Sequence, residues 1–313
     1  MAATSLNDVI IPQVYSDYVV EKTAELSAFY QSGVAVADPV IAAKANGGGN
    51  FVNLPFFNDW SGNDETITDT TDLPLNAVTA GDDVAVKIFR GNALANVDIV
   101  TLLAGANPLQ AVGNLAASYW ARKEQAAMIS VLQGAFTGPL ASSHVLDITG
   151  LSGTANKLSA GAVLDAKQLL GDNADYLSAI VMHSAKFTDL QKQQLITFVT
   201  PAGAPVGFNT YLGYRVIVDD MMPVSSGNYT SYILAQGAVV HQELTVPNPI
   251  EQQRLGTQSK DILITRSGFI THLRGVKWNN TTSNPTNAQL ADGTHWTQVY
   301  QNKQIRAVAL ISK

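Results

Sequence analysis

One long helical segment, residues 107–136, constrains this chain more than any other feature of its sequence. Asn107 is the expected N-cap, because its side chain can accept hydrogen bonds from first-turn N–H groups, and Pro108 suits the first helical position. Gly134 is the expected stop. Apolar residues recur between them at three- and four-residue steps: Val112, Leu115, Ala116, Tyr119, Ala126 and Ile129. A helix from Pro108 to Gln133 spans roughly 39 Å, so the sequence predicts a strut around which the rest of the chain is arranged.

Composition excludes several classes of protein. The 313 residues are 46% hydrophobic and 14% charged, which suffices for a core in one elaborated domain or two. The absence of cysteine excludes disulfides and thiolate chemistry. A net charge of -6 argues against nucleic-acid binding driven by phosphate neutralisation. No apolar run is long enough to cross a bilayer and the N-terminus lacks signal-peptide features, so we expect no membrane contact and a protein made and used in the cytosol.

The N-terminal region predicts an arm followed by a helix. Leu6–Val14 is apolar and contains Pro12, so this stretch is either disordered or laid across another surface, and we interpret it as an arm. Ser16–Gln31 has a helical pattern, with Ser16 as cap and the acids Asp17 and Glu21 near the positive end of the helix dipole.

A β-hairpin with an unusually long connection is predicted next. Phe51–Phe57 is rich in aromatic and β-branched residues, and 84–88 alternates as a strand should. The connection 58–83 exceeds a normal hairpin loop and contains no Lys or Arg. Its acids are Asp59, Asp64, Glu65, Asp69, Asp72, Asp82 and Asp83. Such a segment is either a solvated acidic loop or an arm that reaches a basic surface elsewhere.

The second half of the chain predicts a compact α+β unit. Ser159 is the expected cap of a helix to Leu170, and Ser184 the expected cap of another. The predicted strands are Tyr176–Met182, Tyr214–Asp219, Tyr229–Ala235, Ile262–Ile264 and Phe269–Leu273, with closing strands in Trp296–Ile311.

No pattern typical of a catalytic, cofactor or metal site is present in the sequence. The histidines are far apart and lack zinc-ligand spacing: His144, His183, His241, His272 and His295. No G-x-S-x-G motif occurs. The acid pairs at 82–83 and 219–220 are strand neighbours, whose side chains point to opposite faces. We therefore expect a protein that is not an enzyme.

Several segments, in this order, resemble the major capsid proteins of tailed bacteriophages, which have the Hong Kong 97-like α+β fold. None is a chemical signature, so the specificity lies in their number and order. They are Leu6–Pro12, Asn53–Asp59, Ala121–Ala126, Val181–Ala185, Tyr211–Asp220, Arg274–Trp278 and Asn302–Arg306.

The resemblance implies a division of the chain into five regions. They are an N-terminal arm at 1–45, an extended hairpin loop at 46–97, a peripheral domain with a spine helix at 98–150, an axial domain at 151–270, and closing strands of the peripheral domain at 271–313.

The resemblance also implies a function and partners. The chain is expected to form hexamers and pentamers that close into an icosahedral shell around the double-stranded DNA of a tailed phage. The expected location is the virion capsid, after assembly in the host cytoplasm with a scaffolding protein, a portal and a decoration protein as partners. An encapsulin-like bacterial nanocompartment shell, which has the same fold, is the alternative.

Contacts between neighbouring subunits are expected to involve the acidic loop, because the resemblance places the hairpin of one subunit across the peripheral domain of the next. The candidate acids are Asp64, Glu65, Asp69 and Asp72, and the candidate cations are Arg122 and Lys123 on the spine helix. Some members of this fold cross-link a loop lysine to a neighbour's asparagine. Here no lysine lies between Lys44 and Lys87, so the sequence predicts no such bond.

Overall fold

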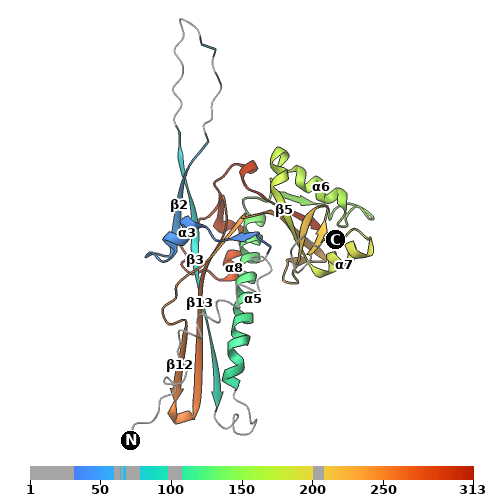
Figure 1. The fold of residues 1–313 in the computed structure, drawn as a ribbon. Coiled ribbons are helices and arrows are strands. Elements are labelled where there is room, and N and C mark those ends of the chain that lie inside the picture. The colour runs from blue at the N-terminus through green and yellow to red at the C-terminus, as the bar shows by residue number, and fades with distance from the viewer. Residues whose placement is uncertain (1–31, 60–63, 65, 68–77, 98–107, 200–207) are drawn as a thin grey trace.

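The long helix is the axis of the structure (Figure 1). In the computed structural model, which describes residues 32–59, 64, 66–67, 78–97, 108–199 and 208–313, helix α5 runs over Pro108–Thr137. The predicted cap Asn107, the arm Leu6–Val14 and the helix Ser16–Gln31 lie outside the described residues. No helix in these described ranges is long and apolar enough to cross a membrane.

The predicted stop at Gly134 is wrong, because this glycine serves packing inside the helix. A Cβ atom there would lie 2.1 Å from the carbonyl oxygen of Leu290 and 2.5 Å from Nε1 of Trp296. Leu290 ends helix α8 (Asn287–Leu290), and its carbonyl accepts a hydrogen bond from the Trp296 indole at 2.8 Å. Only glycine permits this approach without displacing backbone.

The predicted hairpin is present and projects from the molecule (Figure 1). Strand β2 (Phe51–Phe57) runs antiparallel to β3 (Ala80–Val97), with Phe57 opposite Ala80. The connection is therefore shorter than 58–83, since 80–83 belong to β3. Strand β3 includes both Asp82 and Asp83, whose side chains alternate between solvent and the interior of the sheet.

A six-stranded sheet includes this hairpin, in the order β1-β11-β13-β3-β2, with β12 also paired to β13. The short helix α3 (Pro39–Ala45) buries Ile41 against it. The predicted break between 264 and 269 is wrong, because polar residues Thr265 to Gly268 continue the ladder opposite Asn92 to Phe89. The further strands are β1 (Ala35–Val36), β11 (Val239–Glu243), β12 (Ile250–Leu255) and β13 (Lys260–Leu273).

An eight-stranded sheet forms the second unit, in the order β4-β16-β10-β5-β8-β7-β6, with β9 paired to β10. The strands are β4 (Val145–Asp147), β5 (Leu177–Met182), β6 (Thr197–Val199), β7 (Phe208–Tyr211), β8 (Tyr214–Val218), β9 (Val224–Ser225), β10 (Asn228–Ala235) and β16 (Ala307–Ser312).

Two helices pack on this sheet. Ser159 caps α6 (Ala160–Gln168) as predicted. The predicted cap Ser184 is wrong, because Nδ1 of His183 accepts from the Ala185 N–H at 3.1 Å and α7 (Ser184–Lys192) begins one residue earlier. The remaining elements are η2 (Gly171–Tyr176), η3 (Gly256–Gln258), β14 (Val276–Trp278), η4 (Gly293–His295), β15 (Trp296–Gln298) and η5 (Asn302–Gln304).

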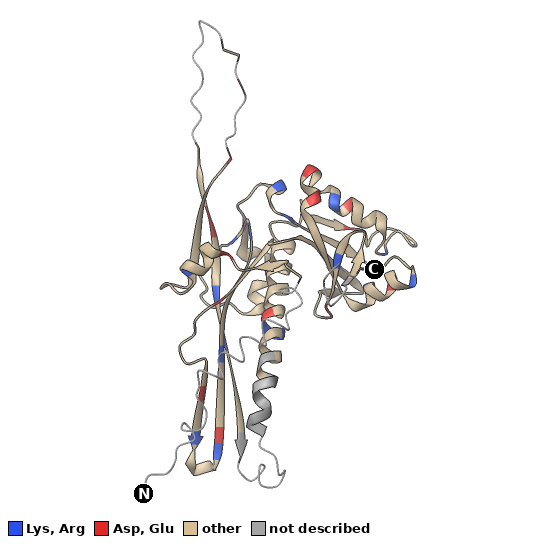
Figure 2. Cartoon of the chain, in the orientation of Figure 1, with Lys and Arg blue, Asp and Glu red and all other residues tan. Residues whose placement is uncertain are grey.

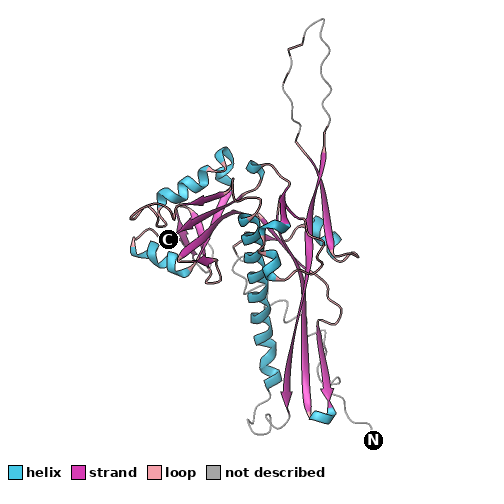
Figure 3. Ribbon diagram, turned by 180° about the vertical axis from the view of Figure 1, so that it is seen from behind, coloured by secondary structure: helices cyan, strands magenta, loops and turns pink. Residues whose placement is uncertain are grey.

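Each of the two sheets takes strands from more than one of the predicted regions. The range 151–270 contributes β5–β10 to one sheet and β11–β13 to the other. The closing strand β16 lies between β4 and β10, where Val308 and Leu310 join the core beneath α6 and α7. Helix α5 lies between the two sheets (Figure 3). Its Phe136 stacks on Tyr232 of β10 at 5.2 Å, and its Leu132 shares a cluster with residues of β3 and β13.

Candidate assembly surfaces

The outer end of the hairpin exposes apolar side chains. The backbone and side-chain amides of Asn58 bond to Thr79 at 2.8 Å each, which continues the ladder outward beyond Phe57. Phe57 is 80% exposed, Ile67 80% and Val78 58%. Three large apolar residues on one projecting segment are typical of a surface that another protein covers.

The predicted inter-subunit residues are only partly described. Asp64 is exposed, whereas Glu65, Asp69 and Asp72 lie outside the described residues. Arg122 and Lys123 are both exposed on α5. Lys123 Nζ lies 5.4 Å from the centre of the Tyr119 ring, and neither cation forms an ion pair within the described part of the chain. Both cations are therefore accessible to a partner.

The neighbouring acids at the start of β3 have opposite environments. The Asp82 side chain is 54% exposed and lies 3.3 Å from Lys277 Nζ, whereas Asp83 is 2% exposed and lies 2.9 Å from Nε2 of the buried His272. Burial disfavours the Asp83 carboxylate, but His272 and the donating N–H of Gly275 (3.0 Å) outweigh it and lower the pKa of Asp83. This pair joins the hairpin root to β13.

A second buried pair joins the spine helix to the same sheet. Glu124 of α5 lies 3.4 Å from Nε2 of His241 on β11, with side-chain exposures of 9% and 8%. The hydroxyl of Ser267 on β13 donates to Glu124 at 2.9 Å. Glu124 is absent from the residues predicted to face inward, although it lies midway between buried Trp120 and Met128 at four-residue steps. The predicted stripe placed Tyr119 and Ala126 inward, and both are only partly buried.

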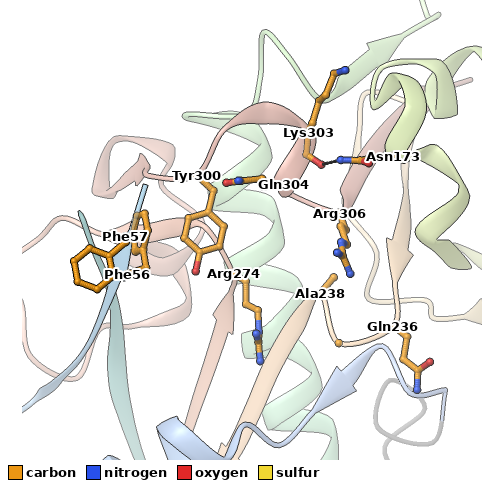
Figure 4. A pocket seen from close by; sticks show the side chains of 11 residues that line it. Phe56, Phe57, Asn173, Gln236, Ala238, Arg274, Tyr300, Lys303, Gln304 and Arg306 are labelled. Carbon is orange, nitrogen blue, oxygen red and sulfur yellow. Dashed lines mark hydrogen bonds between the residues drawn. The ribbon is translucent and has the colours of Figure 1, made fainter. Parts of the chain in front are cut away.

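A hollow of about 550 Å³ lies between elements of the two units (Figure 4). Phe56 and Phe57 of the hairpin, the β10–β11 link 236–238 and the segment before β16 line it. Three of the described lining residues are cationic and none is acidic; the cations are Arg274, Lys303 and Arg306. Elsewhere acidic and basic residues are interspersed, with no long basic stripe on the described chain in this view (Figure 2).

Comparison with known proteins identifies the family. The family model described as major capsid protein 13-like matches residues 13–308. The chain belongs to this capsid protein family. A curated relative, the major capsid protein of Bacillus phage SPP1, is 41% identical over 319 residues, which cover 98% of each chain.

Solved structures similar to this capsid protein confirm the α+β, Hong Kong 97-like fold. A chain of Mycobacterium phage Che8 has a TM-score of 0.56 at 12% identity and covers 88% of both chains. The capsid of a native GTA particle, computed with C5 symmetry, also has a TM-score of 0.56, at 12% identity over 93% of this chain and 90% of that one. The protein is thus a structural component of a phage virion capsid, and the nanocompartment alternative is not favoured.

Proposed function

We propose that this capsid protein assembles as hexamers and pentamers into the icosahedral shell around the double-stranded DNA of a tailed phage. It acts structurally rather than as an enzyme, binds no DNA sequence, and assembles in the host cytoplasm with a scaffolding protein, a portal and a decoration protein. Family membership supports this proposal, and the projecting hairpin with its exposed Phe57, Ile67 and Val78 is the structural observation that carries it. A hairpin of this kind gains little by folding alone and covers apolar area when a neighbour is present.

Assembly of the purified chain tests the proposal. Size-exclusion chromatography and negative-stain microscopy, with and without co-expressed scaffolding protein, are expected to show rings or closed particles. A chain that remains a 33.3 kDa monomer at all concentrations, with scaffold present, contradicts it.

We further propose that the acidic loop fixes the register between subunits. The acids Asp64, Glu65, Asp69 and Asp72 of one subunit would pair with Arg122 and Lys123 of the next. Each exposed pair contributes only about 0.2 to 1 kcal/mol, so these pairs select the correct contact more than they strengthen it.

Neutralising either side tests this pairing. A variant with Asp64→Asn, Glu65→Gln, Asp69→Asn and Asp72→Asn is expected to fold but to give fewer or misshapen particles, with a weaker response to salt than the parent. Arg122→Gln with Lys123→Gln is expected to behave alike. The matched control, Lys157→Gln with Lys192→Gln, alters two exposed lysines of the other unit and is expected to assemble normally. If the variant with the neutralised loop forms normal particles, the loop does not set the register and is only a solvated tip of the hairpin.

We also propose domain boundaries that follow the sheets. The axial domain would comprise β4, the segment from α6 to β10, and β16, while the hairpin, α5 and β11–β15 form the peripheral domain and its loop. The chain would then pass between domains near 141–144, 236–238 and 299–306.

A further inference from the structure

The turn that leads into the hairpin contains the one asparagine of this chain that is followed by glycine, in the pair Asn46–Gly47. In such a pair the backbone nitrogen of the glycine can attack the side-chain carbonyl carbon of the asparagine, because glycine has no Cβ atom to hinder the approach. The attack closes a succinimide ring and begins deamidation. Both residues are exposed, so solvent has access to the pair.

The folded turn holds the two reacting groups away from each other. Asn46 is the C-cap of helix α3 and has a ψ of 3°, which eclipses the Gly47 nitrogen with the Asn46 nitrogen and turns it away from the Asn46 side chain. Oδ1 of Asn46 accepts a hydrogen bond from the Thr245 N–H at 3.0 Å, and the Gly47 N–H donates to the Lys44 carbonyl at 3.1 Å. Ring closure therefore requires the turn to open and ψ to rotate.

A buried lysine tethers the same turn from another strand. Lys87 of β3 is 4% exposed, and its Nζ donates to the Gly47 carbonyl at 2.6 Å. Thr245 lies in the link between β11 and β12, so hydrogen bonds from two places on the six-stranded sheet hold this turn. The residues beyond it are not packed, since a Cβ atom on Gly48 or Gly49 would meet no described atom within 4 Å. The tethers, rather than close packing, keep the turn closed.

We propose that Asn46 is the site at which this chain deamidates spontaneously, and that opening of the tethered turn sets the rate. The Gly47 nitrogen forms a bond to Cγ of Asn46, the bond from Cγ to the side-chain amide nitrogen breaks, and the Gly47 N–H proton ends on the released ammonia. Water then opens the ring at either carbonyl to give aspartate or isoaspartate. Each product adds one negative charge, and isoaspartate also adds a methylene to the main chain at the hairpin root. The proposal concerns a single chain and is independent of the shell.

Peptide mass spectrometry of the ageing protein tests this proposal. The full chain is incubated at mildly alkaline pH, folded in one sample and unfolded in guanidinium chloride in the other. The mass gain of deamidation is expected at Asn46 in both samples and about tenfold slower in the folded one, because local opening must precede the attack. Equal rates in the two samples, a gain at other asparagines while Asn46 stays intact, or no gain in the unfolded chain would overturn the proposal.

Three variants separate the tethers from the local sequence. Lys87→Met removes one tether and is expected to raise the rate severalfold in the folded chain while leaving the unfolded rate unchanged. Lys192→Met, on an exposed lysine of α7, is the matched control and is expected to change neither rate. Gly47→Ala is expected to lose most of the mass gain in both states, because its Cβ atom hinders the attack. An unchanged folded rate in Lys87→Met, with circular dichroism showing the chain to be folded, would contradict control by the tethers.

Discussion

Asp82 and Asp83 carry the same charge one residue apart, yet they contribute differently to the molecule. The pleat of β3 turns Asp82 to solvent and Asp83 into the sheet, where His272 lies 2.9 Å away. An exposed ion pair is worth little, whereas removing one member of a buried pair leaves an uncompensated polar group. The stability of the hairpin root therefore depends on Asp83.

Substitution by asparagine is expected to lower the free energy of unfolding much more at Asp83 than at Asp82. Asp83→Asn is expected to lower the free energy of unfolding by about 3 to 5 kcal/mol, and Asp82→Asn, the matched control, by less than about 1 kcal/mol. Urea unfolding of the unassembled chain, followed by circular dichroism, measures both. Equal losses would contradict the assignment of the buried pair.

The same acid predicts a pH dependence. The pKa of Asp83 is lowered in the folded state, so its carboxylate stabilises the fold above the unfolded pKa of about 4. That contribution is lost as pH falls through the folded pKa. The difference in unfolding free energy between the parent and Asp83→Asn is expected to be constant from neutral pH to about pH 4 and to shrink below it. A difference that grows on acidification would show the sign to be wrong.

Among the elements, α5 depends on a close approach that few helices require. Gly134 brings the helix backbone against the Leu290 carbonyl, and the Trp296 indole completes the contact. Side chains elsewhere on α5 can adjust their rotamers to a neighbour, but a backbone carbonyl cannot move away so cheaply. The register of α8 and β15 on the spine helix is set at this one position.

Alanine at Gly134 is expected to destabilise the protein although alanine favours helices. The added methyl overpacks the contact, which costs about 1 to 3 kcal/mol. Gly161→Ala in α6 is the control, since the nearest atom to its new Cβ would be Ser159 Oγ at 4.0 Å, and it is expected to be neutral or to stabilise by up to about 1 kcal/mol. Thermal unfolding of both variants decides; equal melting temperatures would refute the packing role.

Local chemistry made most elements predictable from the sequence, and long-range contacts account for the errors. The hairpin, the spine helix and the Ser159 cap rest on nearby residues and are confirmed. His183 replaced Ser184 as a cap because an imidazole nitrogen accepts as well as a hydroxyl does. The roles of Gly134 and Glu124 depend on their contacts with Trp296 and His241, respectively. These partners are distant in sequence, so no local pattern predicts the contacts.

At the scale of the whole molecule, the lysines nearest the acidic loop are held at the hairpin root. Lys44 Nζ donates to the Asn53 carbonyl at 2.8 Å, and the buried Lys87 Nζ donates to the Gly47 carbonyl at 2.6 Å. Particles boiled in detergent and reductant are expected to run as one band near 33.3 kDa, because no amine reaches a neighbour from the loop. A ladder of multiples would contradict this, and mass spectrometry of its peptides would identify the linked residues.

The division into units was the least predictable feature of the molecule. Strand patterns in 239–273 and 307–312 indicate strands but not their neighbours; in the structure β13 joins the six-stranded sheet and β16 the eight-stranded sheet. The sheet that a strand joins is decided by pairing partners that can lie more than a hundred residues away. Local sequence patterns do not indicate which strands pair or in which register.

The position of β16 has a consequence for protein synthesis. In the described sheet β4 hydrogen-bonds to β16 alone, with Val145 opposite Ala309, a separation of 309 − 145 = 164 residues. At about 5 to 20 residues per second, a ribosome needs roughly 8 to 33 s after making β4 to reach β16, its pairing partner. Once β10 (Asn228–Ala235) has been made, its edge where β16 will lie is also open. A nascent chain therefore cannot complete this sheet until translation has passed β16, and polysomes should carry subunits that are not yet competent to join a shell.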